Sequence, residues 1–219
     1  DLQAGESYVI FGAKSFAADI PLDTLDGSNG FRLDGVDTFD RAGFSVSGAG
    51  DFNGDGFADL IIGAPSASVP GAQLSGVSYL LFGKSGGFGA AIDLATLDGT
   101  DGVEILGDTE ISGSGFRVSS AGDFNADGLD DLIIGAPGGA NKAGEAIILF
   151  GSQAALGATL SIGALDGSDG IRLQGIAVED YVGSRVSGGG DVNGDGFDDV
   201  ILGGPAAGAD EAGEGYVVF

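Results

Sequence analysis

The sequence of 219 residues predicts an all-β repeat protein, on two observations. An acidic segment recurs, since DFNGDGFAD at 51–59 returns as DFNADGLDD at 123–131 and as DVNGDGFDD at 191–199, at offsets of 72 and 68 residues. In addition, the chain contains 45 glycines, which interrupt every stretch before a helical period can become established. Self-similarity at a nearly constant spacing is typical of repeat architectures, so each copy is expected to form one structural unit.

Each repeat is expected to contain four short strands. In the first repeat, GFSVSG at 43–48 alternates apolar and small residues, whereas DLIIGAP at 59–65 and SYLLFG at 78–83 are apolar runs. A segment of the type NGFRLDG, seen at 29–35, completes the set, and Gly, Asp and Pro separate the strands. Four antiparallel strands in a unit of this size are typical of a β-propeller blade. A solenoid is the competing architecture, although its units are usually shorter.

The chain is expected to form a single propeller region over residues 1–219. Its repeats are expected at approximately 1–42, 43–114, 115–183 and 184–219, and the first and last of these are partial blades. Because closed propellers usually have four to eight blades, about three repeats are too few to close a ring. The chain is therefore expected to be an open segment of a larger propeller, or half of a ring that a homodimer or another chain completes.

The charge balance excludes some partners. Eight Lys and Arg residues stand against 33 Asp and Glu, a formal net charge of −25, so phosphate groups would be repelled and neither nucleic acid nor an anionic membrane is expected as a partner. No run approaches the roughly 18 apolar residues that insertion into a membrane requires. The hydrophobic fraction of 43% and the 14 Phe residues argue against disorder. Cys and His are both absent, which leaves oxygen as the only plausible metal ligand.

The acidic segment predicts a calcium-binding loop. Its pattern, Asp-x-Asn-x-Asp-Gly-x-x-Asp, places side-chain oxygens at alternate positions, and Ca²⁺ takes six to eight oxygen ligands. The glycine at the sixth position permits the sharp turn that would fold the loop round the ion. Three Ca²⁺ sites are expected, each with four side-chain ligands and the backbone carbonyl of the seventh loop residue. The expected ligands are Asp51, Asn53, Asp55, Phe57 (carbonyl) and Asp59; Asp123, Asn125, Asp127, Leu129 (carbonyl) and Asp131; and Asp191, Asn193, Asp195, Phe197 (carbonyl) and Asp199.

Two other interpretations of this loop explain the pattern less well. An EF-hand requires Glu at the twelfth position, which is occupied here by Ile62, Ile134 and Leu202. Simple hairpin turns explain Asn-Gly or Asp-Gly pairs, but a turn does not need three carboxylates and an amide within nine residues. Crowded like charges would destabilise a loop that bound no cation. Cation binding is therefore the favoured interpretation.

Two further repeated features are interpreted as structural. The LDG segments that contain Asp26, Asp98 and Asp166 offer too few oxygens for a second ion and are expected to form tight turns. Arg32 and Arg172 occupy equivalent positions, where the middle repeat has Glu104. They are therefore expected to be solvated strand residues that contribute little.

The combination F-x-V-S-x-x-G-D-x-N-x-D-G-x-x-D-L-I-I-G-A-P, followed by Y-x-x-F-G, resembles the FG-GAP repeats of integrin α subunits and their bacterial relatives. The resemblance covers nearly the whole chain. It implies a β-propeller, commonly seven-bladed, with Ca²⁺ in the loop between the first two strands of a blade. It also implies a secreted or cell-surface location and a role in adhesion or protein binding. The composition, rich in Gly and Asp and free of Cys and Met, looks more like a bacterial exported protein than an animal integrin.

Three functions follow as hypotheses. The first is a calcium-binding extracellular module for adhesion or for protein or glycan binding. The second is a non-catalytic spacer within a large exported surface protein. The third, a propeller domain of a secreted hydrolase, has weaker support. The segment GKSGG around Ser85 matches a nucleophile-elbow pattern, but without any His a Ser-His-Asp triad cannot form. The chain is therefore not expected to be an enzyme.

Overall fold

The computed structural model describes residues 3–208, 210 and 212–219 and shows an all-β chain. Residues 1–2 of the first expected repeat, and 209 and 211 of the last, lie outside the described residues. The strands are β1 (Glu6–Ile10), β2 (Gly30–Asp34), β3 (Ser45–Gly50), β4 (Asp59–Ala64), β5 (Val77–Leu81), β6 (Ala91–Asp93), β7 (Gly102–Leu106), β8 (Arg117–Gly122), β9 (Asp131–Ala136), β10 (Glu145–Leu149), β11 (Thr159–Ser161), β12 (Gly170–Gln174), β13 (Arg185–Gly190), β14 (Asp199–Gly204) and β15 (Glu214–Val218).

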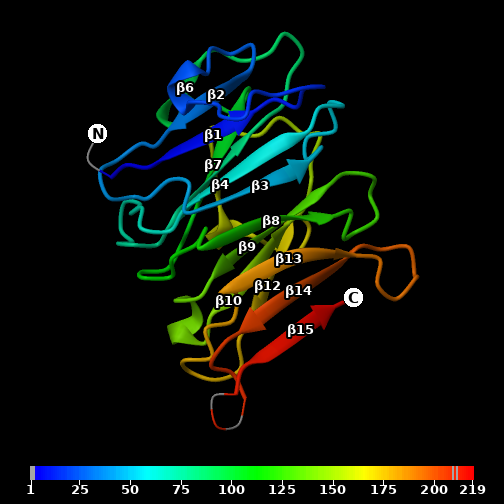
Figure 1. Ribbon diagram of the computed structural model, residues 1–219. Helices are drawn as coiled ribbons and strands as arrows, with labels where there is room; N and C mark the ends of the chain where they lie inside the picture. The colour runs from blue at the N-terminus through cyan, green and yellow to red at the C-terminus, as the bar shows by residue number, and fades with distance from the viewer. Residues whose placement is uncertain (1–2, 209, 211) are drawn as a thin grey trace.

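These strands form four sheets that stack one on the next as an open series (Figure 1). The orders are β1-β2-β6, β11-β7-β5-β4-β3, β12-β10-β9-β8 and β13-β14-β15. The two middle sheets each contain a complete antiparallel set of four strands, β3-β4-β5-β7 and β8-β9-β10-β12. The expected blade is thus confirmed, and the chain is an open segment of a β-propeller.

The apolar runs become the second and third strands of each complete blade because both of their faces are covered. All six residues of β9 and all five of β10 are buried, which is the burial expected for a sheet sandwiched between two neighbours. The largest core cluster joins residues of both complete blades, Ile61 and Leu80 from one and Ile134 and Ile147 from the other. The core therefore lies between the blades, and each blade depends on its neighbour for burial.

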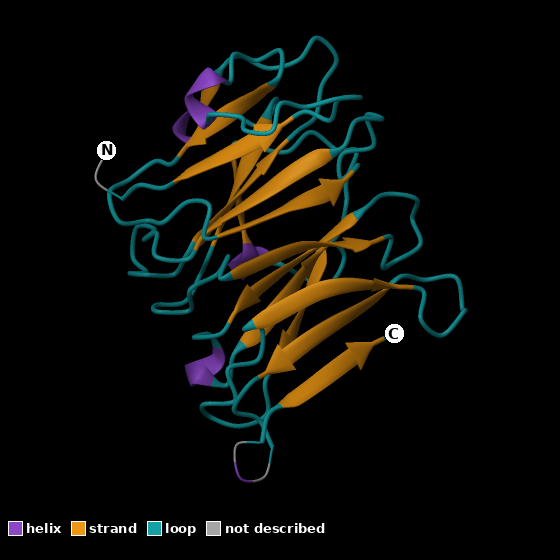
Figure 2. Ribbon diagram, in the orientation of Figure 1, coloured by secondary structure: helices purple, strands orange, loops and turns teal. Residues whose placement is uncertain are grey.

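Two short strands were not anticipated from the sequence. β6 pairs in parallel with β2, and β11 pairs in parallel with β7. Each lies in the connection between the third and fourth strands of its own blade, yet it extends the outer edge of the preceding sheet. The structure also contains 3₁₀ helices at Leu22–Thr24, Leu94–Thr96, Ala140–Lys142 and Ile162–Ala164 (Figure 2). In the part of the chain that the structure describes, no helix is long and apolar enough to span a membrane.

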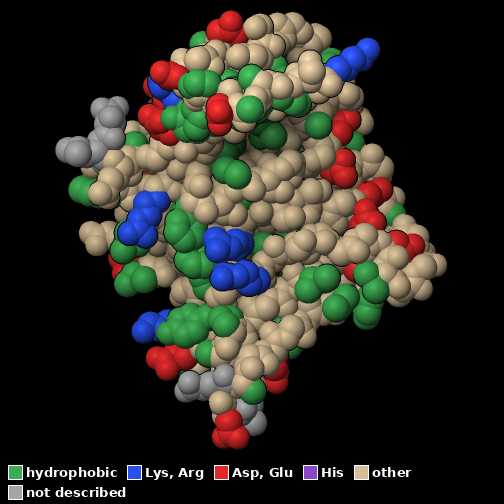
Figure 3. Space-filling model, viewed as in Figure 1, with side chains coloured by type: hydrophobic (Ala, Val, Ile, Leu, Met, Phe, Trp, Pro, Cys, Tyr) green, Lys and Arg blue, Asp and Glu red, His purple; other side chains and the backbone are tan. Residues whose placement is uncertain are grey.

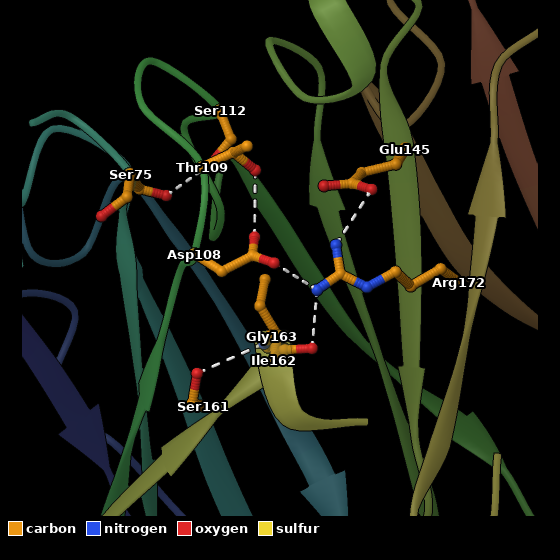
Figure 4. A network of polar contacts seen from close by, with 9 residues as sticks. All are labelled: Ser75, Asp108, Thr109, Ser112, Glu145, Ser161, Ile162, Gly163 and Arg172. Atoms are coloured by element: carbon orange, nitrogen blue, oxygen red, sulfur yellow. Dashed lines mark hydrogen bonds and ion pairs between the residues drawn. The ribbon is translucent and has the colours of Figure 1, made fainter. Parts of the chain in front are cut away.

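The interpretation of Arg172 as a solvated residue is wrong. Its side chain is only 25% exposed, and the guanidinium donates to Oδ2 of Asp108 at 2.5 Å, to Oε2 of Glu145 at 3.3 Å and to the carbonyl of Ile162 at 2.6 Å (Figure 4). Asp108 follows β7 of the preceding blade, so Arg172 connects two blades. Arg32 pairs instead with Asp34 on its own strand, where both side chains are substantially exposed, as expected of a solvated position.

Candidate functional site

The three acidic loops occupy equivalent places in the stack. They join β3 to β4, β8 to β9 and β13 to β14, and they emerge along one edge, where acidic side chains gather in the space-filling view (Figures 1 and 3). Each loop follows an irregularity in strand pairing, which ends at Gly50, Gly122 or Gly190. These glycines have φ of 70°, 72° and 65°, a left-handed conformation that side-chain-bearing residues adopt only at a cost.

The sixth position of each loop makes the sharp turn that the sequence predicts. Gly56, Gly128 and Gly196 have φ of 88°, 91° and 95°, again in the left-handed region. A Cβ on any of the three would meet no atom within 4 Å. Backbone conformation, not space, therefore explains the requirement for glycine at this position.

Within the first loop the side-chain oxygens converge on a run of backbone amides. The N–H of Asp55 lies 3.0 Å from Oδ1 of Asp51 and 3.0 Å from Oδ1 of Asn53. Oδ2 of Asp51 accepts from Gly56 at 2.9 Å, and Oδ1 of Asp55 accepts from Phe57 at 2.9 Å. The side chains at positions one, three and five therefore share the interior of one tight loop.

The second and third loops repeat this arrangement. Corresponding N–H groups donate to Asp123, Asn125 and Asp127 at 2.9 to 3.0 Å, and to Asp191, Asn193 and Asp195 at 2.8 to 3.1 Å. Of the seventh residues, whose carbonyls were the expected ligands, Phe57 and Phe197 are exposed and Leu129 is half-buried.

The ninth residue, in contrast, is fully buried at the base of the loop. Asp59 has no exposed surface, and its carboxylate accepts from the N–H of Phe52 at 2.9 Å and from that of Gly83 at 2.8 Å. Burial raises its pKa to about 6, against the lowering effect of these two hydrogen bonds, and the negative charges of Asp55 and Asp51 raise it further. An ionised Asp59 thus lies in a desolvated position close to other negative charges.

Asp131 has the same environment. It accepts from Phe124 and Gly151, and burial raises its pKa to about 6. Asp199 is also fully buried and accepts from Val192, but its Oδ1 has no hydrogen-bond partner among the described residues.

The side-chain oxygens of the loops suit a cation that takes oxygen ligands, although the carboxylates of a loop do not surround one common position. Among the described residues, no three acidic side chains converge as a metal centre requires. In the first loop, the side-chain oxygens of Asp51 and Asp55 accept hydrogen bonds from the loop's own amides. No ion pair in the described part of the chain involves a loop carboxylate. Since carboxylate and amide oxygens are the ligands that Ca²⁺ prefers, the residues fit this ion by their chemistry. The assignment of individual ligands stays a prediction.

The LDG segments form the turns that the sequence indicates. Oδ1 of Asp26 accepts from the backbone N–H of Ser28 at 2.9 Å and from its hydroxyl at 2.6 Å, and Asp98 and Asp166 accept equivalent pairs of bonds. These bonds lower the pKa of all three carboxyl groups.

The eighth loop residue was not singled out from the sequence, yet it connects neighbouring loops. Oδ2 of Asp130 accepts from the N–H of Asp51 at 2.8 Å, and Oδ2 of Asp198 accepts from the N–H of Asp123 at 3.0 Å. The only sequence signal was that the eighth residue is Asp in the last two loops and Ala58 in the first.

Comparison with known proteins agrees with this architecture. The FG-GAP repeat model matches residues 42–81, 115–149 and 182–218, about half of the chain, and each match contains one acidic loop. The chain is 33% identical over 173 residues to phosphatidylinositol-glycan-specific phospholipase D of Bos taurus, an alignment that covers 77% of this chain and 19% of that protein.

Integrins are also similar to this chain. Integrin alpha-PS5 of Drosophila melanogaster is 32% identical over 165 residues, and integrin alpha-5 of Xenopus laevis is 30% identical over 167 residues. These alignments cover 75% and 74% of this chain but only 15% and 14% of the two integrins. The chain therefore spans less than a fifth of the length of these relatives. Three matched repeats, in phase with three equivalent loops and blades, show that the chain belongs to the FG-GAP repeat family.

Proposed function

We propose that this chain is a calcium-binding β-propeller module that serves adhesion or the binding of a protein or glycan in an extracellular or cell-surface setting. The observation that carries the proposal is the threefold repetition, on one edge of the stack, of a loop with four oxygen-bearing side chains and no described cationic partner. The ligands would be the side chains at loop positions one, three, five and nine, with the carbonyl at position seven. Bound Ca²⁺ would neutralise the carboxylates and hold each loop rigid.

Calcium titration of the chelated protein by calorimetry tests this proposal. The expected stoichiometry is three ions per chain, falling to two in each of the variants Asp55→Ala, Asp127→Ala and Asp195→Ala. Asp26→Ala is the matched control, because it removes an exposed carboxylate of a turn and should leave the stoichiometry unchanged. If the three loop variants bound as much Ca²⁺ as the original chain, the ligand assignment would be wrong.

The adhesion role rests on the family. Integrin α subunits are among the similar proteins, and the loops and edges of a rigid propeller are suitable contact surfaces. Protein and glycan arrays probed with the calcium-loaded chain separate a binding module, which gives specific signals, from a spacer, which gives none. The bacterial origin that the composition indicates stays a prediction, as does the absence of a nucleic-acid or membrane partner.

A part in a secreted hydrolase is the second candidate, because five of the similar proteins carry the name phosphatidylinositol-glycan-specific phospholipase D. We propose that the chain itself is not catalytic. Its 219 residues include no His, and Ser85 lies exposed in a turn after β5. Hydrolysis of a glycosylphosphatidylinositol substrate by the purified chain, lost in Ser85→Ala, would overturn this proposal.

A further inference from the structure

Asparagine followed by glycine occurs three times in the chain, at Asn29, Asn53 and Asn193. Such a pair can lose ammonia when the backbone nitrogen of the glycine attacks the side-chain amide, because glycine has no Cβ to crowd the ring that forms. The pairs at Asn53 and Asn193 lie in acidic loops, whereas the pair at Asn29 lies in the turn before β2. The same dipeptide therefore occurs in two different structural settings.

In the third acidic loop, each group that this reaction uses has a polar partner. Oδ1 of Asn193 accepts from the N–H of Asp195 at 2.8 Å, and Nδ2 of the same amide donates to Oδ2 of Asp195 at 2.9 Å. The N–H of Gly194 donates to Oδ1 of Asp191 at 2.6 Å. A donor thus lies at the oxygen that would gain negative charge, and a carboxylate lies at the nitrogen that must lose its proton.

The first acidic loop holds its amide in the same way. Oδ1 of Asn53 accepts from the N–H of Asp55 at 3.0 Å, and Nδ2 of Asn53 donates to Oδ2 of Asp55 at 3.2 Å. A hydrogen bond from the N–H two residues further on folds the side chain forward, toward the intervening nitrogen of Gly54. Asn193 is exposed and Asn53 is half-buried, so water reaches both.

The pair at Asn29 is held in the opposite direction. Oδ1 of Asn29 accepts from the N–H of Asp26 at 3.1 Å, and Nδ2 donates to the carbonyl of Thr24 at 3.2 Å, so these bonds draw the amide back along the chain. Gly30 is buried at the start of β2, where even a Cβ would collide with the carbonyl oxygen of Val9. Closure of a ring at this pair is therefore opposed by the fold.

The second acidic loop has the environment without the glycine. Asn125 makes the same two bonds to Asp127, at 2.9 and 3.0 Å, but the next residue is Ala126, whose Cβ would crowd the ring. The chain thus contains two matched negative examples. Asn29 has the glycine and a different setting, and Asn125 has the setting and no glycine.

We propose that Asn53 and Asn193 are sites of spontaneous deamidation that alters the acidic loops, and that Asn29 and Asn125 are not. The glycine nitrogen bonds to Cγ of the asparagine, the Cγ–Nδ2 bond breaks, and the proton of the glycine N–H leaves with the departing nitrogen as ammonia. Water then opens the cyclic imide. Cleavage of the new C–N bond gives aspartate, and cleavage of the original backbone C–N bond gives isoaspartate.

Either product changes the third position of the loop, which is an expected calcium ligand. Aspartate keeps an oxygen there and adds a negative charge, whereas isoaspartate adds a carbon to the backbone and displaces the side chain. This consequence rests on the proposed calcium site, in which the ion would hold Oδ1 and the loop in place and so slow ring closure. The extent of deamidation would then reflect the time that the chain has spent without calcium.

Peptide mass spectrometry of the unaltered chain, incubated in chelator at mildly alkaline pH, provides the first test. Trypsin places Asn29, Asn53 and Asn193 on separate peptides, because Lys or Arg residues lie between them. We expect deamidation at Asn53 and Asn193 to be roughly tenfold faster than at Asn29 and Asn125, since a crowding Cβ or a buried glycine adds to the barrier.

Two results would overturn the proposal. One is an equal rate at Asn29 and Asn53 in the folded chain, which would show that the dipeptide alone sets the rate. The other is a rate at Asn53 and Asn193 no higher than at Asn125. In urea, where the fold no longer acts, the rate at Asn29 should rise to that of the other two pairs.

Reciprocal variants isolate the role of the glycine. Ala126→Gly should raise the rate at Asn125 to that at Asn193. Gly194→Ala should lower the rate at Asn193 roughly tenfold, although a Cβ at this position meets no atom within 4 Å. Circular dichroism checks that both variants are folded. If Asn125 stayed intact in Ala126→Gly, the loop environment would not promote ring closure and the proposal would fail.

Calcium provides the last test, with Asn29 as the internal control. Saturating Ca²⁺ should slow deamidation at Asn53 and Asn193 and leave Asn29 unchanged. If the ranking in chelator holds but Ca²⁺ has no effect, the proposed calcium site is wrong and the deamidation sites stand. If calorimetry shows three bound ions but all these asparagines react at one rate, the deamidation sites are wrong and the calcium site stands.

Discussion

At the scale of single residues, Ala126 occupies a loop position where the other two loops have glycine. Its φ is 57°, close to the 70° of Gly54 and the 78° of Gly194. The left-handed conformation costs a residue with a side chain on the order of 1 kcal/mol, because Cβ crowds the backbone. The second loop therefore carries a local strain that the first and third do not.

Ala126→Gly should stabilise the protein by up to about 1 kcal/mol, since the relief of strain exceeds the extra entropy of a glycine in the unfolded chain. Gly194→Ala is the matched reverse change, because a Cβ there meets no atom within 4 Å and the backbone conformation alone is altered. It should destabilise by a similar amount. Urea unfolding at constant calcium measures both, and a stabilising Gly194→Ala would contradict this explanation.

Glu104 introduces a pH dependence. It lies half-buried on β7 opposite Tyr79, and burial raises its pKa. Because the folded state holds the proton more tightly than the unfolded state, Glu104 lowers stability as pH rises from the unfolded pKa through the folded one. Glu104→Gln should therefore raise the thermal midpoint at pH 7, and this gain should disappear below about pH 4. Glu110→Gln, which makes the same change at an exposed position, is the matched control.

At the scale of strands and loops, the interfaces between blades depend on the absence of side chains. At Gly135 on β9 a methyl group would collide with the backbone of Gly183, whereas at Gly203, the equivalent residue on β14, the nearest atom is 3.6 Å away. Two glycines at the same place in the repeat therefore differ only in whether another blade packs against them.

Gly135→Ala should destabilise the protein by about 1–3 kcal/mol or more, because the next blade must move to accommodate the methyl group. Gly203→Ala should change stability by less than about 0.5 kcal/mol. Chemical denaturation of the two variants measures the difference. Equal losses would show that both glycines are needed for the conformation of their own strand and not for the packing of a neighbour.

The sequence was sufficient to predict these elements wherever the pattern is local. The repeated apolar runs predicted the strands β4, β9 and β14, and the positive φ of Gly56 was expected from its place in the acidic motif. Sequence reasoning did not find β6 and β11, because a three-residue strand shows no period and its partner belongs to another blade.

Contacts between distant residues were missed for the same reason. Asp130 binds a backbone group 79 residues earlier, and nothing near it in the sequence indicates this partner. Arg172 resembled a surface residue because its partner Asp108, 64 residues away, comes close only when the blades stack.

At the scale of the whole molecule, the formal charge of −25 opposes compaction, and acidic side chains gather along the edge where the three loops emerge (Figure 3). Repulsion between carboxylates on neighbouring loops is screened by salt and neutralised by bound cations. Stability is therefore expected to depend on the ions present more than it would in a protein of balanced charge.

Calcium at a hundredfold excess over its dissociation constant should raise the thermal midpoint by at least about 5 °C for each site filled. In chelator, 1 M NaCl should recover part of this gain, whereas the same salt should add little to the calcium-loaded protein. Differential scanning calorimetry measures the four conditions. An identical effect of salt with and without calcium would show that the ion does not act on the repulsion between loops.

The placement of β6 and β11 has a consequence for how such a chain can grow. Each short strand lies in one repeat of the sequence but extends the edge of the sheet before it, so the segment that repeats in the sequence is not the unit that folds. The short strand of an inserted repeat pairs with the outer edge of the preceding sheet. The short strand of the next repeat then pairs with the outer edge of the inserted sheet. Lengthening by whole repeats therefore covers the outer edge of each earlier sheet, so that uncovered outer edges stay at the end of the array whatever its length.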